Sequence, residues 1–290
     1  MPFLKKILWA TDFSEEAGEA LYYADMFARA FNADLLALHV VPDFSQALYN
    51  TAMSVKGDLV RRVGEIKQTA EQEFEKIREK KNLSFTSIVK EGKPYEKIVE
   101  TAEEENVDLI VLGKHGMSAL EKLFIGSVTT RVLRSSPVPM LITKKKSPKH
   151  DIKKILVPTD FSEHEEVERD YAFELAEGLG AELNLLHVME LHDYQFSEDT
   201  LEKMMASLQE KLKKRKDRKE KVRVSEYVTR SITAADGIVD YVQRHSFDLV
   251  VISTCGPRKL ERFFLGSTTE KVISLSQFPV FAIPSRFCKE

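Results

Sequence analysis

The chain has 290 residues, about twice the length of a typical domain of roughly 150 residues, so we expect two domains. Hydrophobic residues at 43% and charged residues at 31% exclude wholesale disorder and a membrane-embedded chain. The net charge of -3 excludes the basic field of a protein that coats nucleic acid, and the start of the chain lacks a signal peptide's apolar stretch. We therefore predict a cytoplasmic protein that binds neither nucleic acid nor membranes, and the two cysteines suit a reducing compartment.

The sequence contains an internal repeat that spans most of the chain. KILWATDFS at residues 6–14 returns as KILVPTDFS at residues 154–162, a separation of 148 residues. LEKLFIGS at residues 120–127 matches LERFFLGS at residues 260–267 with a separation of 140, so the second copy is about eight residues shorter in between. A repeat of this length is a complete domain rather than a stacking unit.

The boundary between the copies has the composition of a linker. KKKSPKHD, residues 144–151, is charged, contains Pro148 and lacks periodic apolar residues, all of which are typical of an exposed connection. We therefore predict one domain at residues 1–146 and a second at residues 152–290.

Apolar periodicity predicts alternating strands and helices along the first copy. Ser14 is a predicted N-cap, and Glu15 and Glu16 follow it in the first turn of a helix whose apolar face extends to Phe31. The apolar strands are too far apart for hairpins, so we predict parallel pairing with right-handed crossovers and a doubly wound α/β domain in each copy. The predicted strands are 6–10, 35–41, 85–89, 108–112 and 137–143, and the other predicted helices are 59–77, 94–105 and 126–134.

The loop after the fourth predicted strand carries a spaced glycine motif. It reads Gly113-x2-Gly116-x9-Gly126-Ser127, at the edge of the sheet where doubly wound domains bind ligands. Glycines let backbone amides approach a ligand closely, and Ser127 opens a helix whose free N–H groups and dipole favour phosphate. The spacing matches neither a Walker A loop nor a dinucleotide fingerprint. The alternative interpretation is a set of structural turns followed by a helix cap.

Three features together identify a family that the chain resembles. The glycine motif, Thr-Asp-Phe-Ser at the end of the first strand and Leu-His-Val on the second strand resemble the universal stress protein family, as two tandem copies that cover nearly the whole chain. The resemblance implies a five-stranded parallel sheet of order 3-2-1-4-5 in each copy, with helices on both faces. It also implies binding of ATP or another adenine nucleotide, with Mg²⁺ accompanying ATP, and a role as a stress-response sensor or regulator.

The resemblance assigns a complete nucleotide site to the first copy. Ser127 Oγ and the amides of Ser127 and Val128 would donate to phosphate oxygens. Asp12 would take a ribose hydroxyl or hold Mg²⁺ through water, or it serves only as a turn-forming carboxylate. His115 is interpreted as a phosphate contact rather than a general base, because no paired acid or second histidine lies near it in the sequence. The assigned residues are Ala10, Thr11, Asp12, Val40, Leu112, Gly113, His115, Gly116, Gly126, Ser127 and Val128.

The second copy has a degenerate form of the same motif. Ser253 replaces the first glycine, Cys255 replaces the histidine, and Pro257 removes an amide beside them. We expect the Ser253 side chain to weaken phosphate binding, so the first copy is the predicted principal site. Cys255 is either a redox-sensitive thiol or an unreactive small residue. The assigned residues are Pro158, Thr159, Asp160, Val188, Ile252, Ser253, Cys255, Gly256, Gly266, Ser267 and Thr268.

The sequence also allows other interpretations of the function. Slow ATP hydrolysis, or autophosphorylation on Ser127, Thr129 or Thr130, is one alternative, although no catalytic constellation is present. A nucleotide-free interaction scaffold is another. His39 and His187 lack partners with metal-ligand spacing, so we interpret them as packed core histidines.

Two further segments bear on assembly and partners. The last predicted strands of the copies, 137–143 and 278–283, are apolar and lie at sheet edges. Such edges need another strand, helix or loop packed on them, because an exposed apolar edge pairs with other chains. The resemblance implies that they pair the copies as a pseudo-dimer within one chain, with a homodimer of chains as a further level of assembly. The basic run at 211–221 either contacts an acidic partner or is the solvated end of a helix.

Overall fold

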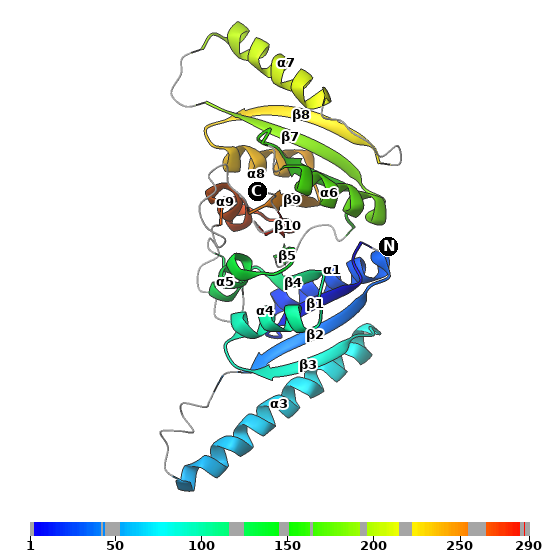
Figure 1. Ribbon diagram of the computed structural model, residues 1–290, viewed down its shortest axis with the longest axis vertical. Coiled ribbons are helices and arrows are strands. Elements are labelled where there is room, and N and C mark those ends of the chain that lie inside the picture. Colours follow the sequence, from blue (N-terminus) through cyan, green and yellow to red (C-terminus); the bar gives the residue numbers. More distant parts are fainter. Residues whose placement is uncertain are drawn as a thin grey trace. The chain divides into compact units, whose positions relative to one another are not determined.

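The computed structural model describes residues 3–41, 43, 53–115, 125–144, 151–162, 165–191, 196–214, 222–254, 265–284 and 287 (Figure 1). Three residues assigned to nucleotide binding, Gly116, Cys255 and Gly256, lie outside the described residues. The chain forms two compact units. The first contains the described residues of 3–115 and 126–138, and the second contains Ile125 and those from Pro139 onward.

Unit 1 alternates strands and helices as the periodicity predicts. All its strand pairs are parallel, in the order β3-β2-β1-β4. The described elements are β1 (Lys6–Thr11), α1 (Glu15–Phe31), β2 (Asp34–Val41), α3 (Met53–Lys81), β3 (Thr86–Glu91), α4 (Pro94–Glu104), β4 (Leu109–Gly113) and α5 (Ser127–Ser135).

Local sequence explains how α1 begins and ends. Ser14 Oγ accepts a hydrogen bond from the Ala17 backbone N–H, which confirms Ser14 as the N-cap. Asn32 ends the helix in the left-handed conformation with φ of 53°, which asparagine tolerates better than most residues. The helix buries one face against the sheet, where Trp9 Nε1 donates to the Ala17 carbonyl at 2.8 Å. The indole also packs edge-on against Phe74 of α3, so α1 and α3 cover the same face.

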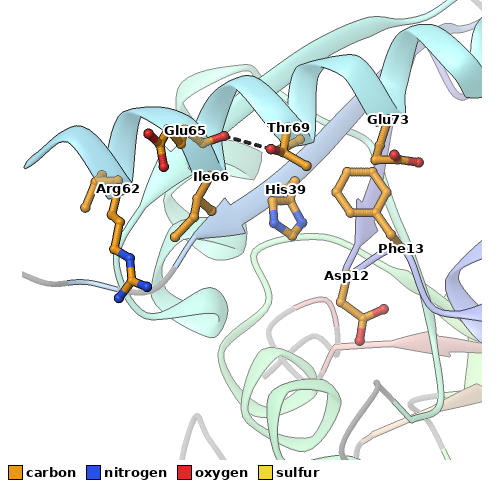
Figure 2. A pocket seen from close by; sticks show the side chains of 10 residues that line it. Asp12, Phe13, His39, Arg62, Glu65, Ile66, Thr69 and Glu73 are labelled. Carbon is orange, nitrogen blue, oxygen red and sulfur yellow. Dashed lines mark hydrogen bonds between the residues drawn. The ribbon is translucent and has the colours of Figure 1, made fainter. Parts of the chain in front are cut away.

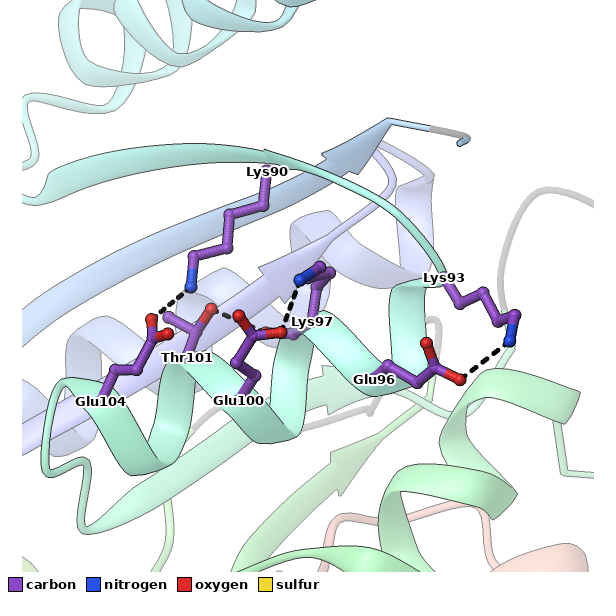
Figure 3. A network of polar contacts seen from close by, with 7 residues as sticks. All are labelled: Lys90, Lys93, Glu96, Lys97, Glu100, Thr101 and Glu104. Atoms are coloured by element: carbon purple, nitrogen blue, oxygen red, sulfur yellow. Dashed lines mark hydrogen bonds and ion pairs between the residues drawn. The ribbon is translucent and has the colours of Figure 1, made fainter. Parts of the chain in front are cut away.

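Helix α4 lies on the opposite face and has a charged outer surface. The strand order requires the crossover from β3 to β4 to run back past β2 and β1, which places α4 opposite α3. Figure 3 shows Lys93 with Glu96 and Lys97 with Glu100 along α4, and Lys90 of β3 with Glu104. Exposed pairs of this kind add little stability. They keep this face polar and leave the buried side of α4 for packing.

Unit 2 repeats the arrangement. Its own five strands follow the parallel order β8-β7-β6-β9-β10, and a sixth strand, β5, joins the edge beside β10. The described elements are β5 (Met140–Thr143), β6 (Lys154–Pro158), α6 (Glu165–Leu179), β7 (Glu182–Glu190), α7 (Glu198–Lys214), β8 (Val224–Ser231), α8 (Ala234–His245), β9 (Leu249–Ser253), α9 (Ser267–Leu275) and β10 (Val280–Ile283).

The pairing of β5 extends the predicted sheet. We expected a five-stranded parallel sheet in each copy, with the last strands of the two copies pairing with each other; β5, from the first copy's sequence, does pair with β10 and runs antiparallel to it, with Leu141 opposite Phe281. All residues of both strands are buried. The two apolar edges therefore cover each other, which satisfies backbone groups that would otherwise be exposed. The strands are also shorter than predicted, because Pro139 and Pro279 precede them and cannot donate to the ladder.

Candidate functional site

The turn after β1 is held by its own side chains. Thr11 Oγ1 accepts a hydrogen bond from the Phe13 N–H at 2.9 Å, and Asp12 Oδ1 accepts one from the Ser14 N–H at 3.1 Å. Phe13 adopts a left-handed φ of 61° within this turn. Asp12 therefore has the turn-forming role that the sequence left open, while its side chain also lines a cavity. The buried Thr11 serves the turn.

Gly113, at the end of β4, packs tightly against the start of α1. A Cβ at this position would lie 3.1 Å from Glu16 Cβ and 3.2 Å from the His115 carbonyl oxygen. The φ of Gly113 lies outside the left-handed region. Close approach, rather than an unusual backbone conformation, is therefore the reason that glycine suits this position.

His115 has an acidic partner that the sequence did not indicate. The Glu16 carboxylate accepts a hydrogen bond from the His115 backbone N–H at 2.9 Å, and His115 Nδ1 lies 3.3 Å from the same oxygen. The histidine side chain is 6% exposed and that of Glu16 is 19% exposed. The sequence shows no paired acid near His115, but the fold supplies one from 99 positions away.

Helix α5 presents its N-terminus beside this loop. Gly126 is the N-cap, it makes no side-chain capping bond, and the first turn contains no acidic residue. The Gly126 N–H donates to the Lys114 carbonyl at 2.8 Å, and Thr129 Oγ1 donates to the Gly113 carbonyl at 2.9 Å. These two bonds hold the start of α5 against the end of β4. Ser127 is exposed at this end of the helix.

Two threonines considered as phosphate acceptors differ in their surroundings. Thr129 is 3% exposed and its hydroxyl is bonded to Gly113, so it acts as a structural tie. Thr130 donates its backbone N–H to the Gly126 carbonyl as part of the first helical turn.

Unit 2 keeps the same framework with different chemistry. Thr269 Oγ1 donates to the Ser253 carbonyl at 2.6 Å, and Gly266 N–H donates to Thr254, as in unit 1. The Ser253 N–H donates to the buried carboxylate of Glu168, which comes from α6. The first turn of α9 contains Glu270, an acid that α5 lacks. A carboxylate at a helix N-terminus competes with phosphate for the positive end of the dipole.

A cavity of about 620 Å³ lies between α3 and the ends of β1 and β2 (Figure 2). Phe13 and His39 form one wall, with ring centroids 4.5 Å apart. His39 Nδ1 lies 2.8 Å from the Thr11 carbonyl oxygen, which can only accept, so Nδ1 carries the proton; this confirms a packed, hydrogen-bonded histidine. The lining residues are Asp12, Phe13, His39, Arg62, Val63, Glu65, Ile66, Thr69, Ala70 and Glu73.

The predicted site residues of unit 1 lie in different places: one lines the cavity, several lie around the N-terminus of α5, and others are in strands. Of these, Asp12 is the one that lines the cavity. Gly113 and His115 lie with Gly126 around the start of α5, through the bonds described above. Ala10 and Leu112 are buried strand residues and Val40 is half-buried.

Two kinds of feature are absent from the described residues. No group of three or more His, Cys, Asp and Glu side chains in that part of the chain is arranged to hold a metal ion. Among the helices that the structure describes, none has the length and apolar character needed to cross a bilayer.

These features define a tandem, doubly wound α/β protein with a glycine-bounded helix N-terminus at the end of the fourth strand of each copy. Universal stress protein family sequences match residues 4–144 and 151–284, so the chain belongs to the universal stress protein family, with two such domains in tandem.

Several individual proteins are similar to this chain. Universal stress protein MJ0577 of Methanocaldococcus jannaschii is 31% identical over 156 residues, which cover 49% of this chain and 96% of that protein. The crystal structure of a universal stress protein from Archaeoglobus fulgidus DSM 4304 covers 96% of this chain and 98% of its own, with 23% identity and a TM-score of 0.70. A shorter structure, a universal stress protein in complex with cAMP, covers 49% of this chain and 99% of its own, with 25% identity and a TM-score of 0.36.

Proposed function

We propose that unit 1 binds an adenine nucleotide, with the phosphates at the N-terminus of α5, and that the bound nucleotide regulates the protein as a stress-response sensor. The observation that carries the proposal is the uncapped start of α5, held against β4 by the bond from Thr129 to Gly113. Free N–H groups and the positive end of a helix dipole form a ready anion site. Ser127 adds an exposed hydroxyl there.

The surroundings of this helix end support an anionic ligand. The first turn has no acid, and His115 lies in the loop bonded to Gly126 through Lys114. Asp12, at the end of β1, would face the ribose or hold Mg²⁺ through water when ATP is bound.

The contrast between the units supports unit 1 as the principal site. Unit 2 has Glu270 in the corresponding first turn and Ser253 in place of Gly113. The acid opposes a phosphate, and the serine adds a side chain where unit 1 has none. We therefore propose weaker nucleotide binding in unit 2.

The two units supply a matched pair of variants for the test. We expect Ser127→Ala to weaken ATP binding by about tenfold, because it removes one hydrogen bond to a charged phosphate. Ser267→Ala, the corresponding change in unit 2, should leave the tighter site unchanged. Calorimetry with ATP, ADP and AMP on nucleotide-free protein measures both. Equal affinity in wild type and Ser127→Ala, or a loss confined to Ser267→Ala, would refute the site.

Slow hydrolysis of bound ATP is a second candidate, favoured by the Glu16–His115 contact. A histidine held by a carboxylate can act as a general base. Water would attack the terminal phosphorus as its bond to the bridging oxygen breaks, and the water proton would pass to His115. We expect phosphate release well below about 1 s⁻¹, and slower still in His115→Gln. An unchanged rate in that variant would exclude His115 from the reaction.

A further inference from the structure

The turn after the first strand is built in the same way in both units. In unit 2, the Phe161 N–H donates to Thr159 Oγ1 at 3.0 Å. The Ser162 N–H donates to Asp160 Oδ1 at 2.8 Å. The turn after β1 in unit 1 makes the same two bonds, so Asp160 occupies the place of Asp12. Unit 2 thus keeps the backbone frame of the nucleoside side of the proposed site.

An aromatic–imidazole pair lies beside this turn in both units. Phe13 and His39 have ring centroids 4.5 Å apart, and Phe161 and His187 have centroids 4.4 Å apart. In each pair, the histidine Nδ1 lies 2.8 Å from the carbonyl oxygen of the threonine in the turn. The two phenylalanines share a left-handed φ, of 61° and 63°. Their rings are therefore equivalent surfaces in the two copies.

The two rings have different neighbours. In unit 1, Phe13 and Asp12 line the cavity of about 620 Å³, a volume in the range of small-molecule sites (Figure 2). Because the proposed function puts the ribose beside Asp12, this cavity is the nucleoside side of that site. In unit 2, Lys211 of α7 places its Nζ 4.1 Å from the centroid of the Phe161 ring, a cation–π contact. The chain's own ammonium group therefore covers, in unit 2, the ring that lines the cavity in unit 1.

Burial aligns the two helices that pack beside these rings. Val63 and Phe74 of α3 are buried and correspond to the buried Leu201 and Leu212 of α7, each pair 138 residues apart. The Phe74 ring also packs edge-on against Phe13, with centroids 5.2 Å apart, so this part of α3 lies directly on the ring. The side chains of α3 and α7 at this place can therefore be compared position by position.

The charge of one helix position decides whether it covers the ring. The separation of 138 residues pairs Glu73 of unit 1 with Lys211 of unit 2. The face of an aromatic ring carries the negative part of its quadrupole, so it attracts an ammonium group and repels a carboxylate. The Glu73 carboxylate is engaged instead by Lys76, at 2.6 Å on the surface of α3. This position therefore favours contact with the ring in unit 2 alone.

A second position differs in size. Ala70 of α3 is buried and lines the cavity of unit 1. The corresponding residue of α7 is Leu208, which is half-buried. Leucine has an isobutyl group where alanine has a methyl group, so it takes up space beside the ring. Unit 2 thus has both a larger side chain and a covering cation where unit 1 has a cavity.

We propose that Lys211 and Leu208 close the nucleoside side of unit 2, as an autoinhibitory contact that keeps unit 2 the weaker site. The inference rests on the proposed function, because it takes the cavity at Asp12 as the place of the nucleoside. It adds a cause of weak binding that is separate from Ser253 and Glu270, which act at the phosphate end. Replacing the two α7 residues by their unit 1 counterparts should therefore open a second nucleoside site.

The test uses adenosine, which has no phosphate and no charge and so reports on the nucleoside side alone. Calorimetric titration of the nucleotide-free full chain should give one adenosine per chain for wild type and two for Leu208→Ala/Lys211→Glu. Adenosine affinity in unit 2 should rise at least about tenfold, because the variant removes the group that competes for the ring and the bulk beside it. Alanine and glutamate are good helix formers, so α7 should persist.

Two matched variants and a label complete the test. Ala70→Leu/Glu73→Lys makes the reverse exchange in unit 1 and should abolish its adenosine binding. Lys153→Ala removes an exposed lysine just before β6, at the opposite end of the strand from the turn, and should still bind one adenosine. Photolabelling with 8-azidoadenosine, followed by mass spectrometry of peptides, should mark unit 1 in wild type and both units in Leu208→Ala/Lys211→Glu.

The outcomes separate this inference from the proposed function. An absence of adenosine binding to wild type would refute the nucleoside site of unit 1, and the inference with it. One adenosine on both wild type and Leu208→Ala/Lys211→Glu would overturn the inference alone, and so would two on wild type. A second site in Lys153→Ala would also overturn it, because the loss of any lysine would then have the same effect.

Discussion

The carboxylate of Glu16 accepts a hydrogen bond of 2.9 Å from the backbone N–H of His115. The same carboxylate oxygen lies 3.3 Å from Nδ1 of that histidine. This contact ties the first turn of α1 to the loop that follows β4. It places an acid beside the histidine of the glycine motif, and it fixes the backbone between β4 and the start of α5.

Glu16→Ala should lower the free energy of unfolding of unit 1 by about 1.5 kcal/mol, at the lower end for a bond to a charged group because Glu16 is partly exposed. Glu16→Gln should retain most of the stability, because the amide oxygen can still accept the His115 N–H. Urea unfolding followed by Trp9 fluorescence reports on this unit, since Trp9 is the single tryptophan and lies in β1. Glu15→Ala, an exposed acid in the same turn, is the control. Equal losses in the Glu15 and Glu16 variants would mean that the contact with His115 contributes nothing.

Two glycine-to-alanine changes should have opposite effects. At Gly113, the added Cβ would meet Glu16 Cβ at 3.1 Å, so α1 or β4 must shift, with a loss of about 1–3 kcal/mol. At Gly18, inside α1, a Cβ has no heavy atom within 4 Å, so alanine should stabilise the helix by about 0.5–1 kcal/mol. Both are measured by the same Trp9-monitored unfolding. A stabilising Gly113→Ala would contradict the close packing described here.

Thr129→Val should uncouple α5 from β4. The variant keeps the side-chain shape but leaves the buried Gly113 carbonyl without its hydroxyl donor, at a cost of about 1–2 kcal/mol. If the nucleotide binds at α5, its affinity should fall as well, because the helix start is less firmly held. Thr269→Val makes the equivalent change in unit 2 and should leave ATP affinity at the tighter site unaltered. The reverse pattern would assign the principal site to unit 2.

Stability at high pH should depend on Tyr241. Burial, and to a lesser extent Tyr227, raises the pKa of Tyr241 to about 12 from 10.0. Because the folded state holds this proton more tightly than the unfolded state, the stabilisation is complete below pH 10 and is lost as the pH rises toward 12. Tyr241→Phe should therefore show a smaller loss of stability across this range than wild type, measured by urea unfolding at several pH values. Parallel curves for the two proteins would show that Tyr241 does not contribute.

Much of each unit could be predicted from the local sequence. The α/β alternation follows from apolar periodicity, and the start of α1 follows from Ser14 and the two acids after it. Errors at element ends have local causes, as at Pro139, where a missing N–H delays the strand that the apolar pattern places earlier. These features depend on residues a few positions apart, so the sequence contains the information directly.

The candidate site was only partly predictable. The glycine motif predicts a phosphate-binding helix end, with Gly113 giving room to the phosphates, whereas the close approach that the structure shows at Gly113 is to Glu16 of α1. The acid beside His115 was missed, because Glu16 lies 99 positions away and no local pattern connects them.

The sequence by itself determined the repeat, the α/β class and the family, because these depend on short motifs and on the spacing of apolar residues. Only the tertiary structure decided the antiparallel register of β5 with β10, the contact of Glu16 with His115, and the surroundings of two equivalent rings, since Phe13 lines a cavity while Phe161 contacts a lysine. Each of these relationships joins residues far apart in the chain. Their formation depends on how strands and helices pack, and no spacing in the sequence records it.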